Sequence, residues 1–257
     1  MGKLSGKVAL VTGSARGLGR AYALHLAQLG ADIVVNDIDM DAAKAYDEKL
    51  TAPTVMDEVR AIGSRSLGIV ADVTDQAQVR SMLAQIISEL GQIDILVNNA
   101  GGALVPGPSY ASSVPEADFR RMLDINLMGT VFCCQAVAEP MKSQGRGKIV
   151  NVGSQAGLRS QGGGGGTSYS VAKAAIHHYT RKLADELGPF GINVNCIAPG
   201  YILSSRAIAG GRNRPESRAR LEGEIALRRL GMPIDCAKVV EFLVTDLSDY
   251  VTGQIIP

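Results

Sequence analysis

Short apolar runs rich in valine and isoleucine alternate along the chain with longer segments whose apolar residues recur at helical spacing. The short runs predict strands at Val8–Val11, Ile33–Val35, Leu67–Val70, Ile95–Val97, Lys148–Val152, Asn193–Ile197 and Gln254–Ile256. The longer segments predict helices at Gly17–Leu29, Asp75–Leu90, Asp118–Met141, Tyr169–Leu187 and Asp235–Thr245. This alternation predicts an α/β fold, a Rossmann-type, doubly wound parallel sheet of about seven strands with helices on both faces.

No repeat, linker or change of composition divides the series, so we predict one domain over residues 1–257. Two stretches depart from the rhythm. Residues 38–57 are long and polar for a strand-to-helix connection, and we expect Pro53 to start a helical turn there. Residues 203–231 are irregular and rich in arginine and glycine, and we predict that they form a mobile flap over the substrate.

Composition narrows the possible partners. Hydrophobic residues make up 46% and charged residues 20% of the 257, as in a well-buried globular protein. The 26 basic and 25 acidic side chains nearly cancel, which argues against nucleic acid and favours small molecules. The four cysteines lack metal-site spacing and read as reduced core residues, so we expect no metal. Without an apolar signal or membrane-length segment, the chain is expected to be soluble and cytoplasmic.

The segment from Val8 to Asp37 predicts a dinucleotide site, because it runs strand, glycine-rich turn, helix, strand and acidic residue. Glycines 13, 17 and 19 let a pyrophosphate approach the helix N-terminus, where free N–H groups favour anions. A glycine triplet alone is weak evidence for a dinucleotide site, but the order of strand, turn, helix, strand and acidic residue strengthens that evidence.

Asp37 and Arg16 point to different nicotinamide cofactors. Asp37 ends the second predicted strand, where a carboxylate can bind both ribose hydroxyls and repel a 2′-phosphate. Arg16 could instead pair with that phosphate, or it could only brace the loop. Because the carboxylate excludes the phosphate directly, we predict NAD rather than NADP.

Tyr169 and Lys173 are four residues apart at the start of a predicted helix and therefore share one face. An ammonium beside the phenol is expected to lower its pKa toward neutrality, so that Tyr169 can exchange a proton with a substrate oxygen. A Tyr and a Lys at this spacing are more often an ordinary surface pair. A longer series of motifs is needed to single them out.

From Lys7 onward the chain resembles the short-chain dehydrogenase/reductase family. The turn TGSARGLG resembles the family's T-G-x-x-x-G-x-G motif, and NNAG and YSVAK repeat two further signatures. The resemblance implies a nicotinamide-dependent oxidoreductase with a Rossmann fold. It also implies a cofactor site formed by Gly13, Arg16, Gly17, Leu18, Gly19, Asp37, Asp72, Val73, Asn99, Ala100, Gly101, Tyr169, Lys173, Pro199, Gly200, Ile202 and Ser204.

The same resemblance implies four catalytic residues. Tyr169 is expected to be the acid/base, and Lys173 to lower its pKa and hold the nicotinamide ribose. Ser154 is expected to hydrogen-bond the reacting oxygen, and Asn126 to position a water in the proton relay. A serine after a strand is otherwise most often a helix cap, and an asparagine in a helix usually a local hydrogen bonder.

The chain departs from the family pattern in two places, between Ser154 and Tyr169 and at the C-terminus. The segment between Ser154 and Tyr169 is longer than usual and contains five glycines at 162–166, either a surface loop or a substrate-side wall. Family members commonly continue beyond the position of Pro257, so a C-terminal contact is expected to be missing.

These features predict an NAD-dependent enzyme that interconverts a secondary alcohol and a ketone. An NADPH-dependent 3-oxoacyl thioester reductase is the alternative, and a non-catalytic nucleotide-binding subunit a remote one. Apolar surplus at Val131, Phe132 and Ile176 suggests a homo-oligomer, a tetramer by resemblance. The flap segment 206–229 holds seven arginines against three glutamates, so the substrate could be anionic, with Arg206 its best ligand.

Overall fold

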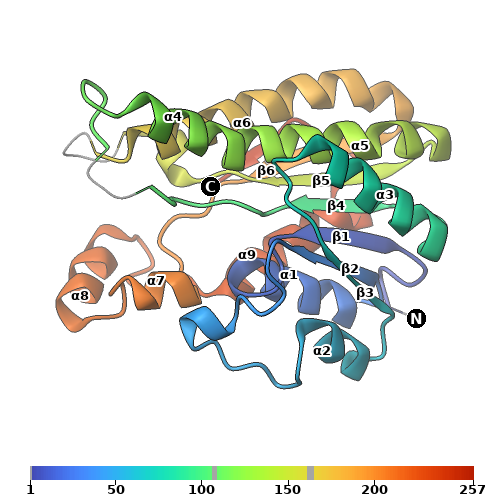
Figure 1. The fold of residues 1–257 in the computed structure, drawn as a ribbon, viewed down its shortest axis with the longest axis horizontal. Coiled ribbons are helices and arrows are strands. Elements are labelled where there is room, and N and C mark those ends of the chain that lie inside the picture. Colours follow the sequence, from blue (N-terminus) through green and yellow to red (C-terminus); the bar gives the residue numbers. More distant parts are fainter. Residues whose placement is uncertain (1, 106–108, 161–164) are drawn as a thin grey trace.

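The computed structural model describes residues 2–105, 109–160 and 165–257, and it contains one parallel sheet of seven strands (Figure 1). The strand order is β3-β2-β1-β4-β5-β6-β7, so the order reverses between β1 and β4. The strands are β1 (Val8–Thr12), β2 (Asp32–Asp37), β3 (Ser66–Val70), β4 (Ile95–Asn98), β5 (Gly147–Val152), β6 (Ile192–Ile197) and β7 (Ile255–Ile256). The predicted fold class is confirmed.

Helices cover both faces of the sheet (Figure 1). One layer holds α1 (Gly17–Gln28), α2 (Val55–Ile62) and α9 (Pro233–Val244); the other holds α3 (Gln76–Leu90), α4 (Glu116–Leu123), α5 (Gly129–Gln144) and α6 (Thr167–Leu187). Each layer buries its own apolar cluster against the sheet. The central strand β1 is buried along its whole length, which explains its uninterrupted apolar sequence.

Three local predictions need correction. The predicted helix Asp118–Met141 is split by a π-helical turn at Asp124–Met128, between α4 and α5. Pro53 does not start the helical turn, because α2 begins at Val55 after the N-cap Thr54, whose side chain accepts a hydrogen bond from the Asp57 amide. The irregular segment 203–231 contains two helices, α7 (Ser205–Ala209) and α8 (Pro215–Glu224).

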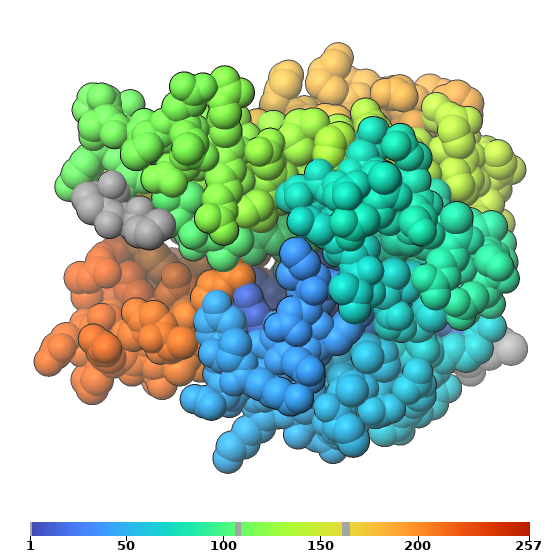
Figure 2. All heavy atoms as spheres, in the orientation of Figure 1, coloured from blue at the N-terminus to red at the C-terminus, as the bar shows by residue number. Residues whose placement is uncertain are grey.

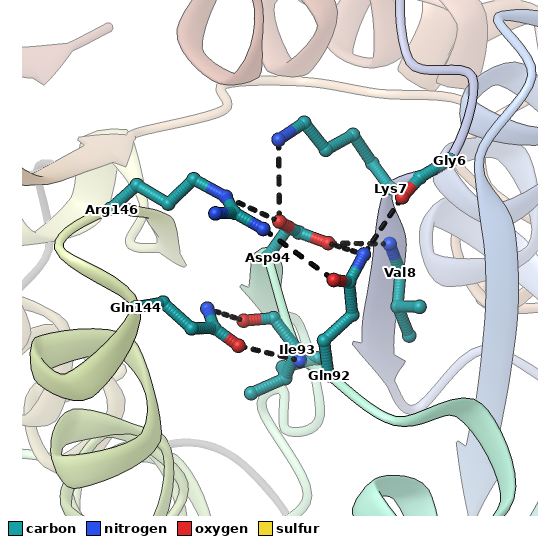
Figure 3. A network of polar contacts seen from close by, with 8 residues as sticks. All are labelled: Gly6, Lys7, Val8, Gln92, Ile93, Asp94, Gln144 and Arg146. Atoms are coloured by element: carbon teal, nitrogen blue, oxygen red, sulfur yellow. Dashed lines mark hydrogen bonds and ion pairs between the residues drawn. The ribbon is translucent and has the colours of Figure 1, made fainter.

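A polar network ties together the amino ends of the central strands (Figure 3). Asp94, just before β4, accepts hydrogen bonds from the Val8 amide at 3.0 Å, Lys7 Nζ at 3.3 Å and Arg146 Nε at 3.1 Å. Only 4% of its side chain is exposed. These contacts fix β1, β4 and β5 at the edge of the sheet opposite their carboxyl ends.

The four cysteines, Cys133, Cys134, Cys196 and Cys236, are all buried and unpaired, as predicted for reduced core residues. None of the helices within the described ranges is both long and apolar enough to cross a membrane.

Candidate active site

A cleft of about 1310 Å³ opens at the carboxyl ends of the strands, where the strand order reverses. In Figure 2 the surface is hollowed where the green, blue and orange parts of the chain meet. The cleft is lined by most of the predicted site residues: Gly13, Arg16, Gly17, Leu18, Asp37, Asp72, Val73, Asn99, Ala100, Gly101, Ser154, Tyr169, Lys173, Pro199, Gly200, Ile202 and Ser204. Gly19 and Asn126 lie outside its lining.

The glycine-rich turn is held in one conformation by the loop that follows β4. Asn99 Nδ2 donates to the carbonyl oxygens of Thr12 and Gly13, both at 2.9 Å. Thr12 Oγ1 in turn accepts from the Asn99 and Ala100 amides at 3.0 Å. Gly19 closes this packing, because any Cβ there would overlap the Gly13 carbonyl oxygen. The turn is therefore a preformed cradle at the N-terminus of α1, which fits a pyrophosphate.

Asp37 and Arg16 of the predicted set lie beside the glycine-rich turn, at the adenosine end of the cleft. Asp37 Oδ2 accepts from the Ala15 amide at 3.1 Å and Oδ1 from the Ile38 amide at 2.9 Å, so its carboxylate is fixed beside the turn. The Arg16 guanidinium lies 4.2 Å from the centre of the Tyr46 ring. Burial lowers the pKa of Arg16, and the like charge of Arg206 lowers it further. A fixed carboxylate here fits a ribose with free hydroxyls.

Tyr169 and Lys173 lie on one face of α6 at the centre of the cleft. Lys173 Nζ is 5.7 Å from the centre of the Tyr169 ring and donates to the Val152 carbonyl oxygen at 2.7 Å. The predicted lowering of the tyrosine pKa was wrong for this structure, because burial raises the pKa of Tyr169. A hydrogen bond from Ser154 and the charges of Arg206 and Arg212 act in the opposite direction.

Lys173 is itself strongly perturbed. Only 4% of the residue is exposed, and burial lowers the pKa of its ammonium to about 8. A buried ammonium that titrates near neutrality and faces a phenol is the arrangement expected where protons are exchanged.

Ser154 follows β5 and caps the short 3₁₀ turn η3 (Gln155–Gly157), with its Oγ accepting from the Ala156 amide at 3.2 Å. Its hydroxyl also bonds to the Tyr169 phenol. The capping role and the cleft-facing role thus coexist in one side chain.

Asn126 lies in the π-helical turn and is fully buried. Its Oδ1 accepts from the Gly102 amide at 2.9 Å, and its Nδ2 donates to the carbonyl oxygens of Gly102 and Met122, both at 3.1 Å. The side chain therefore holds the turn after NNAG in place, and its predicted contact with a water stays a prediction.

His177 was not predicted from the sequence, yet it supports the Ser154 turn from below. The imidazole is 3% exposed, and its Nε2 accepts from the Ser154 amide at 3.4 Å. A Cβ at Gly153 would collide with this ring, so the glycine makes room for it. Burial lowers the pKa of His177, which keeps the imidazole neutral and Nε2 free to accept. One helical turn separates it from Lys173.

Two flap arginines reach into the cleft. Arg206 Nη1 donates to the Gly101 carbonyl oxygen at 3.1 Å, across the cleft from α7. Arg212 Nη1 donates to the Ile202 carbonyl oxygen at 2.6 Å. Three of the later flap arginines are paired with carboxylates: Arg218 with Glu222, Arg220 with Glu224 and Arg229 with Asp235. Of the glycine run at 162–166, residues 162–164 lie outside the described residues.

Comparison with known proteins agrees with this geometry. A family model described as Enoyl-(Acyl carrier protein) reductase matches residues 13–257. Cyclohexanol dehydrogenase of Rhodococcus sp. (strain TK6) is 50% identical over 261 residues, covering 99% of this chain and 95% of that protein. A 3-oxoacyl-[acyl-carrier-protein] reductase of Staphylococcus aureus (strain Mu50 / ATCC 700699) is less similar, 35% over 250 residues, covering 97% and 95%.

A solved structure of 7α-hydroxysteroid dehydrogenase with NADH and 7-oxo glycochenodeoxycholic acid superposes with a TM-score of 0.87. That protein is 36% identical, and the match covers 98% of this chain and 92% of that one. The chain belongs to the short-chain dehydrogenase/reductase family. It is an oxidoreductase that interconverts a secondary alcohol and a ketone by hydride transfer. The 3-oxoacyl thioester reductase is a more distant relative than the cyclohexanol dehydrogenase.

Proposed function

We propose that this chain is an NAD-preferring alcohol dehydrogenase in which Tyr169 is the general acid/base. The observation that carries the proposal is the convergence of Tyr169, Lys173 and Ser154 at the centre of a cleft whose glycine-rich end fits a dinucleotide. The bound nicotinamide would accept or supply the hydride. Gly13, Leu18, Asp37 and the loop from Asn99 to Gly101 would hold the dinucleotide, whereas the Gly17 amide is already bonded to the Glu48 carboxylate.

The protein's own residues transfer the proton between the enzyme and the substrate oxygen. The Tyr169 phenolate takes a proton from the substrate alcohol, or in the reverse direction the Tyr169 phenol donates its proton to the carbonyl oxygen, while hydride moves. Ser154 hydrogen-bonds the same oxygen and keeps it aligned with the phenol. The Lys173 ammonium lies 5.7 Å from the centre of the Tyr169 ring. Arg206 and Arg212 add positive charge from the flap, which opposes the effect of burial on the pKa of Tyr169.

NAD preference is supported by the position of Asp37. Its carboxylate is fixed beside the glycine-rich turn by two backbone amides, so it cannot easily turn away from a 2′-phosphate. A negative charge held there repels the phosphate and accepts hydrogen bonds from the ribose hydroxyls.

The proposal also covers the substrate class and the oligomeric state. The substrate is a small alcohol or ketone. Residues 203–231 act as a flap that covers it on a single domain, and the arginines of this flap favour an anionic substrate.

We also propose a homotetramer. Ile176 is fully buried within the chain, so it cannot contribute to a subunit interface. Val171 and Phe190 can contribute to one, because they are 42% and 45% exposed. Light scattering should then give four times the chain mass of 26.9 kDa, and a monomer mass would overturn this part.

The central test is Tyr169→Phe. Removing the hydroxyl leaves the ring in place, so turnover of a secondary alcohol should fall by about 10²-fold or more while NAD binding persists. Tyr250→Phe is the matched control, because Tyr250 is fully exposed, and it should retain parental turnover. Near-parental turnover in Tyr169→Phe would assign the proton transfer to another group.

A further inference from the structure

Residues 39–54, between β2 and α2, form a segment that we name the strap. It contains the short 3₁₀ helix η1 (Lys44–Tyr46), followed by Asp47 in the left-handed region with φ +48°. The strap lies in light blue beside the orange α7 in Figure 1, and the two elements are in contact. Tyr46 lines the cleft together with Arg16, Asp37 and Ile38. The strap is therefore part of the adenosine end of the cleft.

Glu48 fastens the strap to the start of α1. Both carboxylate oxygens accept from the Gly17 amide, at 3.1 and 2.9 Å, and Oε1 pairs with Arg20 Nη1 at 3.1 Å. A carboxylate at a helix N-terminus is favoured by the free amides and the helix dipole. Arg20 is held on its other side by the buried Glu58, at 2.7 and 2.6 Å. The anchor is thus a network of charge-assisted bonds rather than a single surface contact.

The anchor places Tyr46 beneath Arg16. The guanidinium stacks over the phenol ring at 4.2 Å, and in the described ranges it makes no hydrogen bond. Stacking of this kind is attractive and restricts where the guanidinium can point. Arg16 also has two carboxylates within electrostatic range, Asp37 and Glu48. Arg16, a cation near the proposed ribose position, is therefore held by an aromatic ring and offset by two negative charges.

We propose that Tyr46 and Glu48 are specificity-determining residues of the adenosine end: Glu48 anchors the strap, and Tyr46 holds Arg16 by stacking, so that the guanidinium walls the ribose instead of pairing with a 2′-phosphate. The inference rests on the proposed NAD preference and adds to it. Asp37 repels the phosphate, and the strap holds Arg16 away from a position in which its guanidinium could compensate for that repulsion. The ligand class is a dinucleotide with an unphosphorylated adenosine ribose.

The test is calorimetric binding of NAD and NADP to the full chain, which requires no turnover. Tyr46→Ala should release Arg16 and shift the NAD-to-NADP affinity ratio toward NADP by about five- to tenfold, since a freed guanidinium can grip a phosphate in bidentate fashion. Tyr46→Phe keeps the stacking ring and should retain the parental ratio. Glu48→Gln loses the Arg20 ion pair and should shift the ratio in the same direction as Tyr46→Ala.

Combining Tyr46→Ala with Arg16→Ala identifies the group responsible. The double variant should lose the gain in NADP affinity, because the gain is assigned to Arg16. An unchanged ratio in Tyr46→Ala, a shift toward NAD, or an equal gain in the double variant would overturn the inference. Tighter parental binding of NADP than of NAD would overturn the proposed cofactor preference, whereas the strap is judged by the change in ratio alone.

Discussion

At the scale of single residues, Lys173 couples the chemistry of the cleft to the stability of the fold. Its ammonium is buried, and its pKa in the folded chain is about 8, below the ordinary value of 10.5. Between these two pH values the unfolded chain binds more protons than the folded chain, so the free energy of unfolding rises with pH across this window. Below about pH 8 the buried charge is present in full and opposes folding.

Lys173→Met should therefore be more stable relative to the parent at neutral pH than at alkaline pH. The difference in free energy of unfolding between the two chains should change by about 3 kcal/mol from neutral pH to beyond pH 10, since one pKa unit corresponds to about 1.4 kcal/mol. Urea unfolding at several pH values measures it. A difference that does not vary with pH would show that Lys173 titrates normally, whatever the loss of activity in the variant.

His177 offers a second prediction at this scale. His177→Leu removes the acceptor for the Ser154 amide, so the serine turn should loosen and turnover should fall by about tenfold, the cost of one lost buried hydrogen bond. Because the Ser154 hydroxyl lowers the pKa of Tyr169, the pH dependence of alcohol oxidation should also move to higher pH. His177→Gln, which retains an acceptor, should restore part of both.

The matched control is His178→Leu. His178 is the next residue on α6 and is exposed, so its loss should leave turnover and the pH profile unchanged. If His177→Leu lowered stability but left the pH profile in place, the residue would be a packing residue only.

At the scale of secondary structure elements, the carboxyl ends of the strands form the cleft and the amino ends stabilise the sheet. The carboxyl ends of β1, β4, β5 and β6 lead into the cleft, and the amino ends of β1, β4 and β5 are joined by the Asp94 network (Figure 3). Asp94→Ala should therefore lower the free energy of unfolding by about 3 kcal/mol, because Lys7, Arg146 and the Val8 amide lose their shared acceptor. Turnover per folded molecule should stay parental.

Chemical unfolding and turnover assays on the same samples separate these two effects. Glu116→Ala is the control, since Glu116 and Arg120 are a surface pair with side chains 77% and 73% exposed. Its effect should stay below about 0.5 kcal/mol. If folded Asp94→Ala lost turnover, the Asp94 network at the amino ends of the strands would also be needed to shape the cleft at their carboxyl ends.

How far the sequence predicts these elements depends on whether the determining contacts are local. The strands and most helices follow from apolar periodicity, and most of the predicted site residues line one cleft because parallel strands end at the same edge. The π turn at Asp124–Met128 has no periodic signal, since it depends on the bonds of Asn126 to Gly102. The contact of Glu48 with Gly17 links segments 31 residues apart, so no local pattern shows it.

The pKa of Tyr169 was mispredicted for the same reason. Four-residue spacing placed the ammonium and the phenol together, but it could not show how deeply the protein buries the phenol. Nor could it show that Lys173 Nζ bonds to the Val152 carbonyl oxygen. His177 escaped notice because a histidine in a helical pattern carries no signal until Gly153 and Ser154 are known to pack against it.

At the scale of the whole molecule, charge is unevenly distributed although the formal net charge is only +1. Among described residues that line the cleft, seven cations face three carboxylates. The cations are Arg16, Arg120, Arg121, Lys173, Arg206, Arg212 and Arg220, and the carboxylates are Asp37, Asp72 and Asp124. A concave site with this excess concentrates anions from solution, and added salt weakens the effect. The dinucleotide itself is anionic, so cofactor and substrate share the field.

We expect an anionic substrate to use this field through Arg206. Arg206 lines the cleft, and its buried Nε has no hydrogen-bond partner in the described chain, so the protein does not use all the donors of this guanidinium. Arg206→Ala should raise KM for an anionic secondary alcohol by about tenfold or more, the equivalent of about 1.5–3 kcal/mol, and affect a neutral alcohol little. Arg218→Ala is the control, because Arg218 is half exposed and paired with Glu222.

The measurement is kcat/KM for the two alcohols at low and high salt, with NAD saturating so that effects on cofactor binding do not enter. Salt should reduce the parental preference for the anion, and it should have less effect in Arg206→Ala, because one of the charges being screened is gone. Equal losses on both alcohols would assign Arg206 to the positioning of the bound dinucleotide rather than to substrate binding, since its guanidinium also reaches the Gly101 carbonyl oxygen. A parental preference for the neutral alcohol that ignores salt would leave the flap arginines as an exposed, solvated face with no role in substrate choice.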